Sequence, residues 1–332
     1  MKFKSLICMF LALGVAFAAV PAQAAKTMKV GLGVPESHFE VRAMKEFKKY
    51  VEEKTGGEIL VDLYPATQLG NDKEVLEAIK VGVAHMNLPG PAVLGNFVKD
   101  FTIVGLPYLF ATQEIADKVV DGPWGEALLK KLEPAGFVGL GFGDFGYRHV
   151  TNNVRPITKL EDFKGLKIRV MQNPSHLAVF RSLGANPTAM AFSEVFSGLQ
   201  QGVIDGQENP LKNITSNKVY EVQKHLTLSR HVYEWIVFVV GKKFYDGLTP
   251  DQQQILQEAS HIARDYMRNA VVADDAEALE EIRAAGLTIT ELEPAEFARI
   301  QDTATKTVIE EASKINPQLY KELVEAIAEA SK

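Results

Sequence analysis

The sequence predicts an α/β fold with a mainly parallel sheet. Strand and helix patterns alternate between Met28 and Leu88 in the order β-α-β-α-β, which is typical of parallel sheets. The same alternation returns between Leu166 and Gln201, and the chain is almost wholly helical from Thr249 onward. No Pro/Ser-rich linker separates these regions, so we expect them to share elements rather than to form independent domains.

The N-terminal elements follow from hydrophobic periodicity. Apolar residues alternate with polar ones in the expected strands and recur at spacings of three and four in the expected helices. Gly56-Gly57 and Gly82 supply helix stops, and Asn71 or Asp72 fits a helix N-cap. The expected elements are a strand at 28–34, a helix around 43–51, a strand at 58–64, a helix ending at Gly82 and a strand at 83–88.

The middle of the chain repeats this pattern. Ser193 fits the N-cap of a helix that Gly202 would end. A long apolar strand at 231–240 could run between two halves of the molecule. The expected elements before it are a strand at 166–170, a helix at 175–183, a short strand at 186–190 and a helix at 193–201.

The C-terminal part is predicted to consist of helices. Thr249-Pro250 is a typical helix start, and the apolar stripe after it continues toward Ile282, which is long for a globular helix. Two further helices are expected, near 294–314 and 317–330.

The N-terminus predicts export from the cytoplasm. Lys2 and Lys4 precede an apolar run from Leu6 to Val20, and Ala22-Gln23-Ala24 is a small-x-small cleavage signal. Residues 1–24 therefore form an expected secretory signal peptide, cleaved near Ala24, and the mature protein is expected in a bacterial periplasm. No second apolar run of membrane length follows.

Composition excludes several classes of protein. The chain has 332 residues and a formal charge of −6, which argues against a broad basic face for nucleic acid. The one cysteine, Cys8, lies near the start of the apolar run rather than after it, so we expect neither lipidation nor disulfides. The mature chain offers no thiolate to a metal or a substrate.

Sequence matches to known catalytic and cofactor motifs lack the neighbouring elements that those motifs require. Residues 141–146 match G-x-G-x-x-G, but an extended stretch follows where a nucleotide site needs a helix. We interpret this segment as a glycine-rich crossover, and Asp144-Phe145-Gly146 lacks the companions of a kinase motif. The histidines form no H-x-x-x-H pair, and no G-x-S-x-G elbow is present. We therefore expect no enzyme activity, no cofactor and no metal site.

Arg169 is the strongest candidate for ligand binding. It lies in the apolar run Gly165–Val170, and a buried arginine is costly unless an anion meets it. No acidic residue lies close in sequence, and a guanidinium holds a carboxylate through two parallel hydrogen bonds. The anion is then an external carboxylate or, as the alternative, a side chain distant in sequence.

Three other residues carry weaker signals. Arg148 lies in an extended stretch near Asn152-Asn153, where a surface arginine is the alternative. Asn209 precedes Pro210, which disfavours helix and can leave the amide pointing into a cleft, although a turn-forming Asn is the alternative. Phe192 is most simply a core residue.

Taken together, the motifs closely resemble the extracytoplasmic solute-binding proteins of TRAP transporters, the DctP family. They span most of the mature chain in the family's order. They are Leu63-Tyr64-Pro65 with Gln68-Leu69-Gly70, Gly105-Leu106-Pro107-Tyr108, Gly165–Val170, Gly184-Ala185-Asn186-Pro187, Met190–Val195, Gly206-Gln207-Glu208-Asn209-Pro210 and Tyr220–Lys224.

The resemblance implies roles for particular residues. Arg169 would form the principal salt bridge to a ligand carboxylate, Arg148 would be the second cationic contact, and Asn209 would contact the ligand or order the site. Phe192 would wall the pocket. From the other lobe, the loop 35–39 would reach the ligand, with His38 and Glu36 as candidates, and Tyr233 and Trp235 lie near the presumed cleft.

The resemblance also implies a two-lobed clamshell with discontinuous lobes. Lobe I would comprise 26–146 and 235–274, and lobe II 147–234 and 275–332. The long strand around Trp235 and the long helix after Pro250 would be shared hinge elements.

The implied function is capture of a carboxylate-bearing organic acid in the periplasm and its delivery to the membrane permease of a TRAP transporter, with the protein acting as a monomer. A sensory input and a secreted enzyme acting on an organic acid are the alternatives.

Leu88-Pro89-Gly90-Pro91 offers no acidic or hydroxyl side chain, which departs from relatives that bind polyhydroxylated acids. An apolar or aromatic tail on the ligand is one expectation, from the aromatics Phe39, Phe142, Phe145, Tyr147, Tyr233 and Trp235, while C4-dicarboxylates, sugar acids and keto acids stay open.

Overall fold

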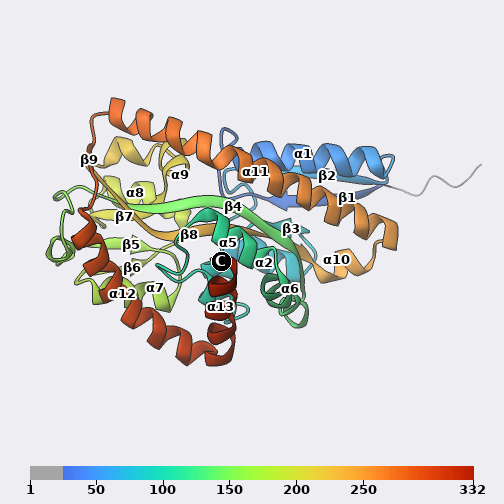
Figure 1. The fold of residues 1–332 in the computed structure, drawn as a ribbon. Coiled ribbons are helices and arrows are strands. Elements are labelled where there is room, and N and C mark those ends of the chain that lie inside the picture. The colour runs from blue at the N-terminus through green and yellow to red at the C-terminus, as the bar shows by residue number, and fades with distance from the viewer. Residues whose placement is uncertain (1–24) are drawn as a thin grey trace, which may run out of the picture.

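A single mixed sheet organises the molecule. The computed structural model describes residues 25–332, so the expected signal peptide, its cleavage site and Cys8 lie outside the described residues. The sheet has nine strands in the order β2-β1-β3-β8-β4-β7-β5-β6, with β9 (Thr288–Thr290) added beside β8 (Figure 1). Strands β1, β2 and β3 lie together at one end of the sheet, and β5, β6 and β7 lie at the other. The long strands β4 and β8 lie between these two groups.

One end of the sheet is the parallel unit that the N-terminal pattern predicts. Strand β1 (Lys26–Gly31) pairs in parallel with β2 (Ile59–Tyr64) and with β3 (Met86–Asn87). Helices α1 (Phe39–Lys54) and α2 (Asp72–Lys80) connect these strands, and Asn71 caps α2 with Glu74 in a capping box. Strand β1 starts and ends earlier than the hydrophobic pattern indicates, because residues after Gly31 already form the loop toward α1.

The other end repeats this architecture. Strand β5 (Ile168–Val170) pairs in parallel with β6 (Thr188–Ala189) and with β7 (Gly206–Pro210), and α7 (Pro174–Ser182) and α8 (Val195–Gln200) are the connecting helices. The N-cap expected at Ser193 is wrong. Ser193 lies inside a short 3₁₀ turn at Phe192–Glu194, and α8 begins only after it.

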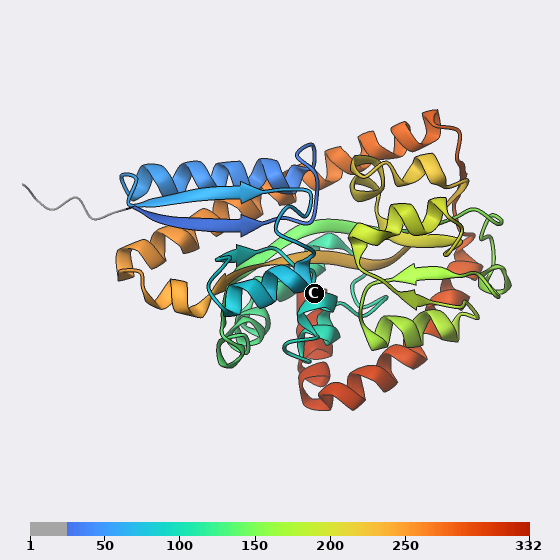
Figure 2. The same cartoon turned by 180° about the vertical axis from the view of Figure 1, so that it is seen from behind.

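Two long antiparallel strands connect these ends. Strand β4 (Phe137–Asn152) pairs with β8 (His225–Gly241); β8 also pairs with β3, and β4 with β7. The glycine-rich segment 141–146 is therefore part of a strand, with register shifts at its glycines, and no helix begins there. Figure 2 shows both strands passing behind the two end groups.

The helical tail ties the ends together. Helix α11 (Pro250–Ala284) starts at a Thr249 capping box, packs on α1 and β4, and reaches α9 (Leu211–Ser216). Helix α12 (Pro294–Ile315) packs on α7, and α13 (Pro317–Ala330) turns back onto α5 (Gln113–Val120) and α6 (Pro123–Lys130) (Figure 1). The last helix thus lies against the N-terminal end of the sheet, whereas the resemblance assigns it to the other lobe.

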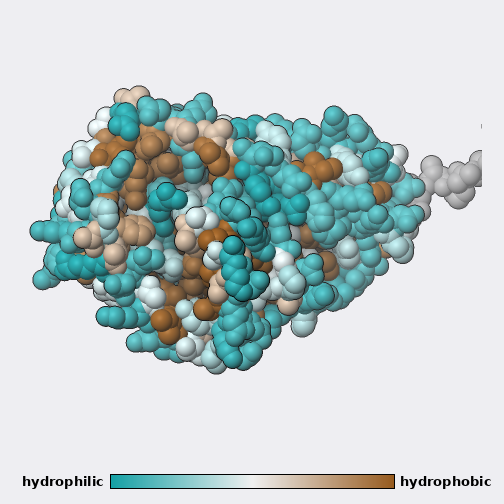
Figure 3. Space-filling model, in the orientation of Figure 1, coloured by the Kyte–Doolittle hydropathy of each residue, from teal (hydrophilic) through white to brown (hydrophobic). Residues whose placement is uncertain are grey.

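The remaining helices and turns are short. They are α3 (Pro91–Leu94), α4 (Phe101–Val104) and α10 (Lys242–Asp246), with 3₁₀ turns at Glu133–Ala135, Leu160–Phe163 and Val219–Val222. The face in Figure 3 is largely hydrophilic, with separate apolar patches. Within residues 25–332, no helix combines the length and apolar character needed to span a bilayer.

Candidate functional site

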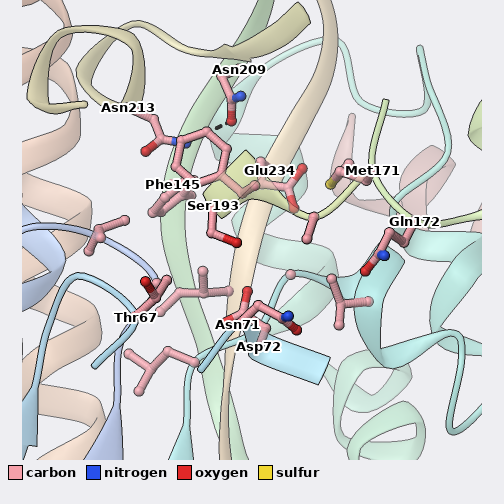
Figure 4. Close-up of a pocket in the computed structure, with 18 of the residues that line it drawn as sticks. Thr67, Asn71, Asp72, Phe145, Met171, Gln172, Ser193, Asn209, Asn213 and Glu234 are labelled. Atoms are coloured by element: carbon pink, nitrogen blue, oxygen red, sulfur yellow. Dashed lines mark hydrogen bonds between the residues drawn. The ribbon is translucent and has the colours of Figure 1, made fainter. Parts of the chain in front are cut away.

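A cavity of about 100 Å³ lies where the two parallel units face each other. Its lining comes from the segments after β1, β2 and β3, from the ends of β5 and β7, and from the middle of β4 and β8. Ligands in α/β proteins bind at the carboxyl ends of parallel strands, where side chains of successive loops converge. The lining residues are Gly33, Val34, Glu40, Thr67, Asn71, Asp72, Lys73, Leu88, Gly90, Val93, Phe145, Arg148, Arg169, Met171, Gln172, Ala191, Phe192, Ser193, Asn209, Asn213, Glu234 and Ile236 (Figure 4).

Arg169 lines this cavity without an ion pair. Arg169 is only 3% exposed, and within residues 25–332 its guanidinium has no carboxylate partner at salt-bridge distance. Its Nε and Nη2 both donate to the Met190 carbonyl oxygen, at 2.9 and 2.8 Å. Burial lowers the pKa of Arg169 to about 10, so the charge is poorly compensated within the protein. The alternative of a distant structural partner finds no support.

Arg148 is also buried, but its charge is already matched. Its Nε donates to Glu208 Oε2 at 2.5 Å and its Nη2 to Glu208 Oε1 at 2.9 Å, while Nη1 lies 3.3 Å from Glu234 Oε2. Burial alone would raise the pKa of Glu208, yet Arg148 and His231 hold that pKa well below its usual range. Burial raises the pKa of Glu234 to about 7, against the opposing effect of Arg148. The surface alternative for Arg148 is therefore wrong.

Asn209 lies within a chain of hydrogen-bonded side-chain amides at the cavity. Its Nδ2 donates to Gln207 Oε1, and its Oδ1 accepts from Asn213 Nδ2 at 2.7 Å. Gln207 in turn donates to Thr151 Oγ1 at 2.9 Å, which fixes the orientation of both amides. Figure 4 shows Asn209 and Asn213 on one side of the cavity and Thr67, Asn71 and Asp72 on the other.

Comparison with known proteins identifies the family. The family model described as bacterial extracellular solute-binding protein, family 7 (DctP), matches residues 30–314. The chain belongs to the DctP family. The C4-dicarboxylate-binding periplasmic protein DctP of Rhodobacter capsulatus is 38% identical over 286 residues, covering 86% of each chain. The 2,3-diketo-L-gulonate-binding periplasmic protein YiaO of Escherichia coli is 32% identical and covers 90% of this chain and 91% of its own.

Solved DctP structures share the whole fold. The sugar acid binding protein DctPAm of Advenella mimigardefordensis, in complex with galactonate, superimposes with a TM-score of 0.90 at 32% identity over 92% of this chain and 99% of its own. A TRAP periplasmic solute-binding protein of Sulfurospirillum deleyianum with bound succinate gives 0.82 at 33% identity, covering 93% and 99%. The chain is thus a two-lobed α/β solute-binding component of TRAP-type transport, from an extracytoplasmic family.

Four residues named from the family resemblance lie outside the cavity lining. Trp235 is fully buried in the core beside Phe110, and the Tyr233 hydroxyl donates to Asp144 Oδ1 at 2.8 Å. His38 is a buried helix cap, and Glu36 forms a surface ion pair with Lys45. Strand alternation explains Tyr233 and Trp235, because their neighbours Glu234 and Ile236 take the cavity-facing positions.

The aromatic lining expected from sequence is mostly absent from the cavity. Of the six aromatics named, only Phe145 lines it, together with Phe192, whose ring centroid lies 5.8 Å from Arg169 Cζ. Phe142, Tyr233 and Trp235 belong to one hydrophobic core cluster, and Tyr147 packs against it. An aromatic ligand tail therefore has little support in this DctP protein.

Sequence reasoning missed most of the polar lining. Glu40, Thr67, Gln172 and Glu234 carried no motif, and Asp72 was considered only as a helix cap. Thr67 adopts the left-handed region at φ 57°, which is uncommon for a β-branched residue and marks a constrained loop at the cavity. The backbone conformation of Thr67 cannot be predicted from the sequence pattern. The polar residues that follow the expected strands, such as Thr67 after β2 and Gln172 after β5, could have been named as candidates from their positions.

His38 offers a test that separates a cap from a ligand contact. Its Nδ1 accepts from the backbone N–H of Glu40 at 3.1 Å, and burial lowers the pKa of its imidazole to about 3. We expect His38→Ala to lower the free energy of unfolding by about 1–2 kcal/mol, the usual cost of losing a helix cap, as measured by urea denaturation. Loss of acid binding with unchanged stability would instead assign His38 to the ligand.

Proposed function

We propose that the chain captures an organic acid by its carboxylate in the periplasm and delivers it to the membrane permease of a TRAP transporter. The observation that carries the proposal is Arg169, a buried guanidinium at the cavity for which residues 25–332 supply no ion-pair partner. Relatives of the same fold support it, since their solved structures contain galactonate, D-erythronate, β-D-galacturonate and succinate. Maturation by cleavage near Ala24 belongs to this proposal.

The free end of the guanidinium suits a carboxylate. Met190 takes up Nε–H and one Nη2–H, which leaves the Nη1 side and the second Nη2–H. These parallel donors match the two oxygens of a carboxylate, a charge-assisted pair that is stronger where water is excluded. Arg148 would have a different role from Arg169. Its charge is neutralised by Glu208 and Glu234, so it can donate a hydrogen bond to the ligand but adds no net positive charge to the cavity.

Binding would couple to closure of the two lobes. Cavity residues come from both parallel units, so a bound acid contacts both and favours the closed arrangement as a population shift. We assign 26–146 with 235–274 to one lobe and 147–234 with 275–332 to the other, with α13 docked back on the first. The strands β4 and β8 and helix α11, which pass from one lobe to the other, would act as the hinge. The acid leaves chemically unchanged.

A thermal-shift panel tests the proposal. The panel contains D-galactonate, D-erythronate, D-galacturonate, pantoate and succinate, with the neutral polyol galactitol as control. A bound acid at a hundredfold excess over its Kd adds about 2.7 kcal/mol of stability, which corresponds to a rise in Tm of roughly 4 °C for a chain of about 300 residues. We expect at least one acid to give this shift and galactitol to give none. Equal shifts for acids and galactitol would contradict carboxylate recognition.

A further inference from the structure

Glu234 is a buried carboxyl at the cavity whose arginine contact is long and shared. It lies on β8, is 4% exposed and lines the cavity, and Figure 4 shows its carboxyl among the lining side chains. Its hydrogen bond within residues 25–332 comes from Arg148 Nη1 at 3.3 Å. Arg148 donates its Nε–H and Nη2–H to Glu208, at 2.5 and 2.9 Å, and His231 Nε2 lies 3.0 Å from the same carboxylate. The charge of Arg148 is therefore held mainly by Glu208, and Glu234 is the weaker partner.

Four buried charged side chains interact at this cavity, and a ligand carboxylate would unbalance them. The two cations are Arg148 and Arg169. The two carboxylates are Glu208 and Glu234, and each of these four residues is at most 4% exposed. A carboxylate bound to Arg169 adds a third negative charge to two positive ones, in an interior where water screens charges weakly. Such an excess is relieved when the carboxylate that is least stabilised as an anion takes up a proton.

The other titratable groups around Glu234 do not supply the missing positive charge. Burial lowers the pKa of His149 to about 3 and that of His176 to about 4, so both imidazoles are neutral at pH 7. His231 contacts Glu208 rather than Glu234. The remaining charged groups near the site are carboxyls, which can only add negative charge, and one exposed lysine; they are Glu40, Asp72, Glu194 and Lys73.

The pKa of Glu234 lies where a ligand charge can change its protonation. Burial raises this pKa to about 7, while the charges of Arg148 and Arg169 act in the opposite direction, so Glu234 is mostly ionised at pH 8 in the ligand-free protein. A ligand carboxylate at Arg169 cancels the effect of that guanidinium, and the pKa of Glu234 rises further. Glu208 does not compete for the proton, because its pKa, which burial alone would raise, is held well below its usual range by Arg148 and His231.

We propose that this protein binds its acid together with one proton, which Glu234 takes up from the solvent as the ligand carboxylate binds to Arg169. This inference rests on the proposed function and adds a proton to the ligands of the same site. The proton converts the Glu234 carboxylate into a carboxyl, whose O–H can donate a hydrogen bond to the ligand instead of repelling it. No bond of the acid is broken, and the proton returns to the solvent when the acid leaves.

Titration calorimetry in buffers of different ionisation enthalpy counts this proton. The panel acid with the largest thermal shift is titrated into the wild type at pH 8 in phosphate, HEPES and Tris. Because the buffer supplies the proton, the slope of the observed heat against the buffer's ionisation enthalpy gives the number of protons taken up. We expect between about half and one proton per bound acid, since Glu234 changes from mostly ionised to protonated. A slope of zero would overturn the inference.

The affinity for the acid should depend on pH in a defined window. Below about pH 7 Glu234 is already protonated in the free protein, so the affinity should level off there. Above it, each unit of pH should weaken binding by up to about ten-fold, until the pKa of the bound form is passed. Asp72, whose pKa burial raises to about 6, changes its charge mainly below this window. A Kd that stays constant from pH 7 to pH 9 would contradict proton uptake.

Glu234→Gln tests whether Glu234 is the group that takes up the proton. The amide has the size of the carboxyl, does not titrate and leaves the ion pair of Arg148 with Glu208 in place, so we expect a folded protein. This variant should take up almost no proton at pH 8 and should lose the pH dependence of the Kd above pH 7. Glu46→Gln, the same change at an exposed glutamate on α1, should behave as the wild type does. Undiminished proton uptake by Glu234→Gln would place the proton on another group, such as His231, and overturn the assignment.

Failure of this inference and failure of the proposed function give different results. If the acid binds, Arg169→Gln abolishes that binding and the wild type takes up no proton, carboxylate capture stands and the proton inference is wrong. If no panel acid binds through Arg169, both are wrong.

Discussion

Arg169→Gln is expected to weaken organic-acid binding by about 2–5 kcal/mol, which is at least a thirty-fold loss of affinity. The reason is that the guanidinium is the one buried cation at the cavity that no carboxylate in residues 25–332 neutralises. The shorter, neutral amide of glutamine cannot offer parallel charged donors to a carboxylate. Titration calorimetry with the panel acid that gives the largest thermal shift measures this loss.

The same variant should fold as stably as the wild type, within about 1 kcal/mol. Inside the protein Arg169 has lost its hydration and gained only two hydrogen bonds to Met190, so removing its charge breaks no ion pair. Arg181→Gln, the same change at an exposed arginine on α7, is the control for both measurements. Intact acid binding by folded Arg169→Gln would contradict the assigned role.

Arg148→Met should have the opposite profile, with a large loss of stability. Removing this guanidinium leaves Glu208 with only its His231 contact and leaves Glu234 without its ion pair, and breaking a buried pair in this way typically costs about 3–5 kcal/mol. Urea denaturation at pH 8 measures the cost. Adding Glu208→Gln to the variant should restore part of the stability, since the most strongly uncompensated carboxylate is then gone.

The stability loss in Arg148→Met should depend on pH, because the substitution changes the pKa of Glu208 in the folded protein. In the wild type the lowered pKa of Glu208 stabilises the fold above its ordinary pKa, and this is lost as pH falls through the folded value. In Arg148→Met, the largest effect that lowers the pKa of Glu208 is lost while its burial and its His231 contact remain, so that pKa rises and the folded variant gains a proton at higher pH than the wild type. The stability difference between the two proteins should therefore shrink from pH 8 to pH 5. A pH-independent difference would mean that packing, rather than charge, dominates.

Helix caps and hydrophobic periodicity were sufficient to predict the elements that short stretches of sequence determine. An N-cap at Asn71 or Asp72, the start of a helix at Thr249-Pro250 and the parallel units were predicted from caps and side-chain periodicity. The structure confirms them, with Asn71 as the cap. The extended stretch expected after residue 146 is the second part of β4, but its first part was missed because the glycines there suppress the alternating pattern. The pairing of β4 with β8 is a contact between segments distant in sequence. The N-cap at Ser193 failed because a 3₁₀ turn, which has no strong sequence signature, precedes α8.

The site was predictable in part for the same reason. An arginine inside an apolar run is visible locally, and Arg169 lies at the cavity with no carboxylate partner in residues 25–332. The partners of Arg148 are 60 and 86 residues away in the chain, so its compensation is a tertiary property. Glu40 and Asp72 are 32 residues apart in the chain and line one cavity only in the folded protein, which is why sequence patterns did not indicate them.

The central claim is that the Arg169 guanidinium recognises a ligand carboxylate. Calorimetry of wild type and Arg169→Gln with D-galactonate and with its neutral amide, D-galactonamide, tests it most directly; if another panel acid binds more tightly, that acid and its amide are used. The wild type should prefer the acid by at least about thirty-fold, and the variant should lose that preference. The same acid-to-amide ratio in both proteins would contradict the claim.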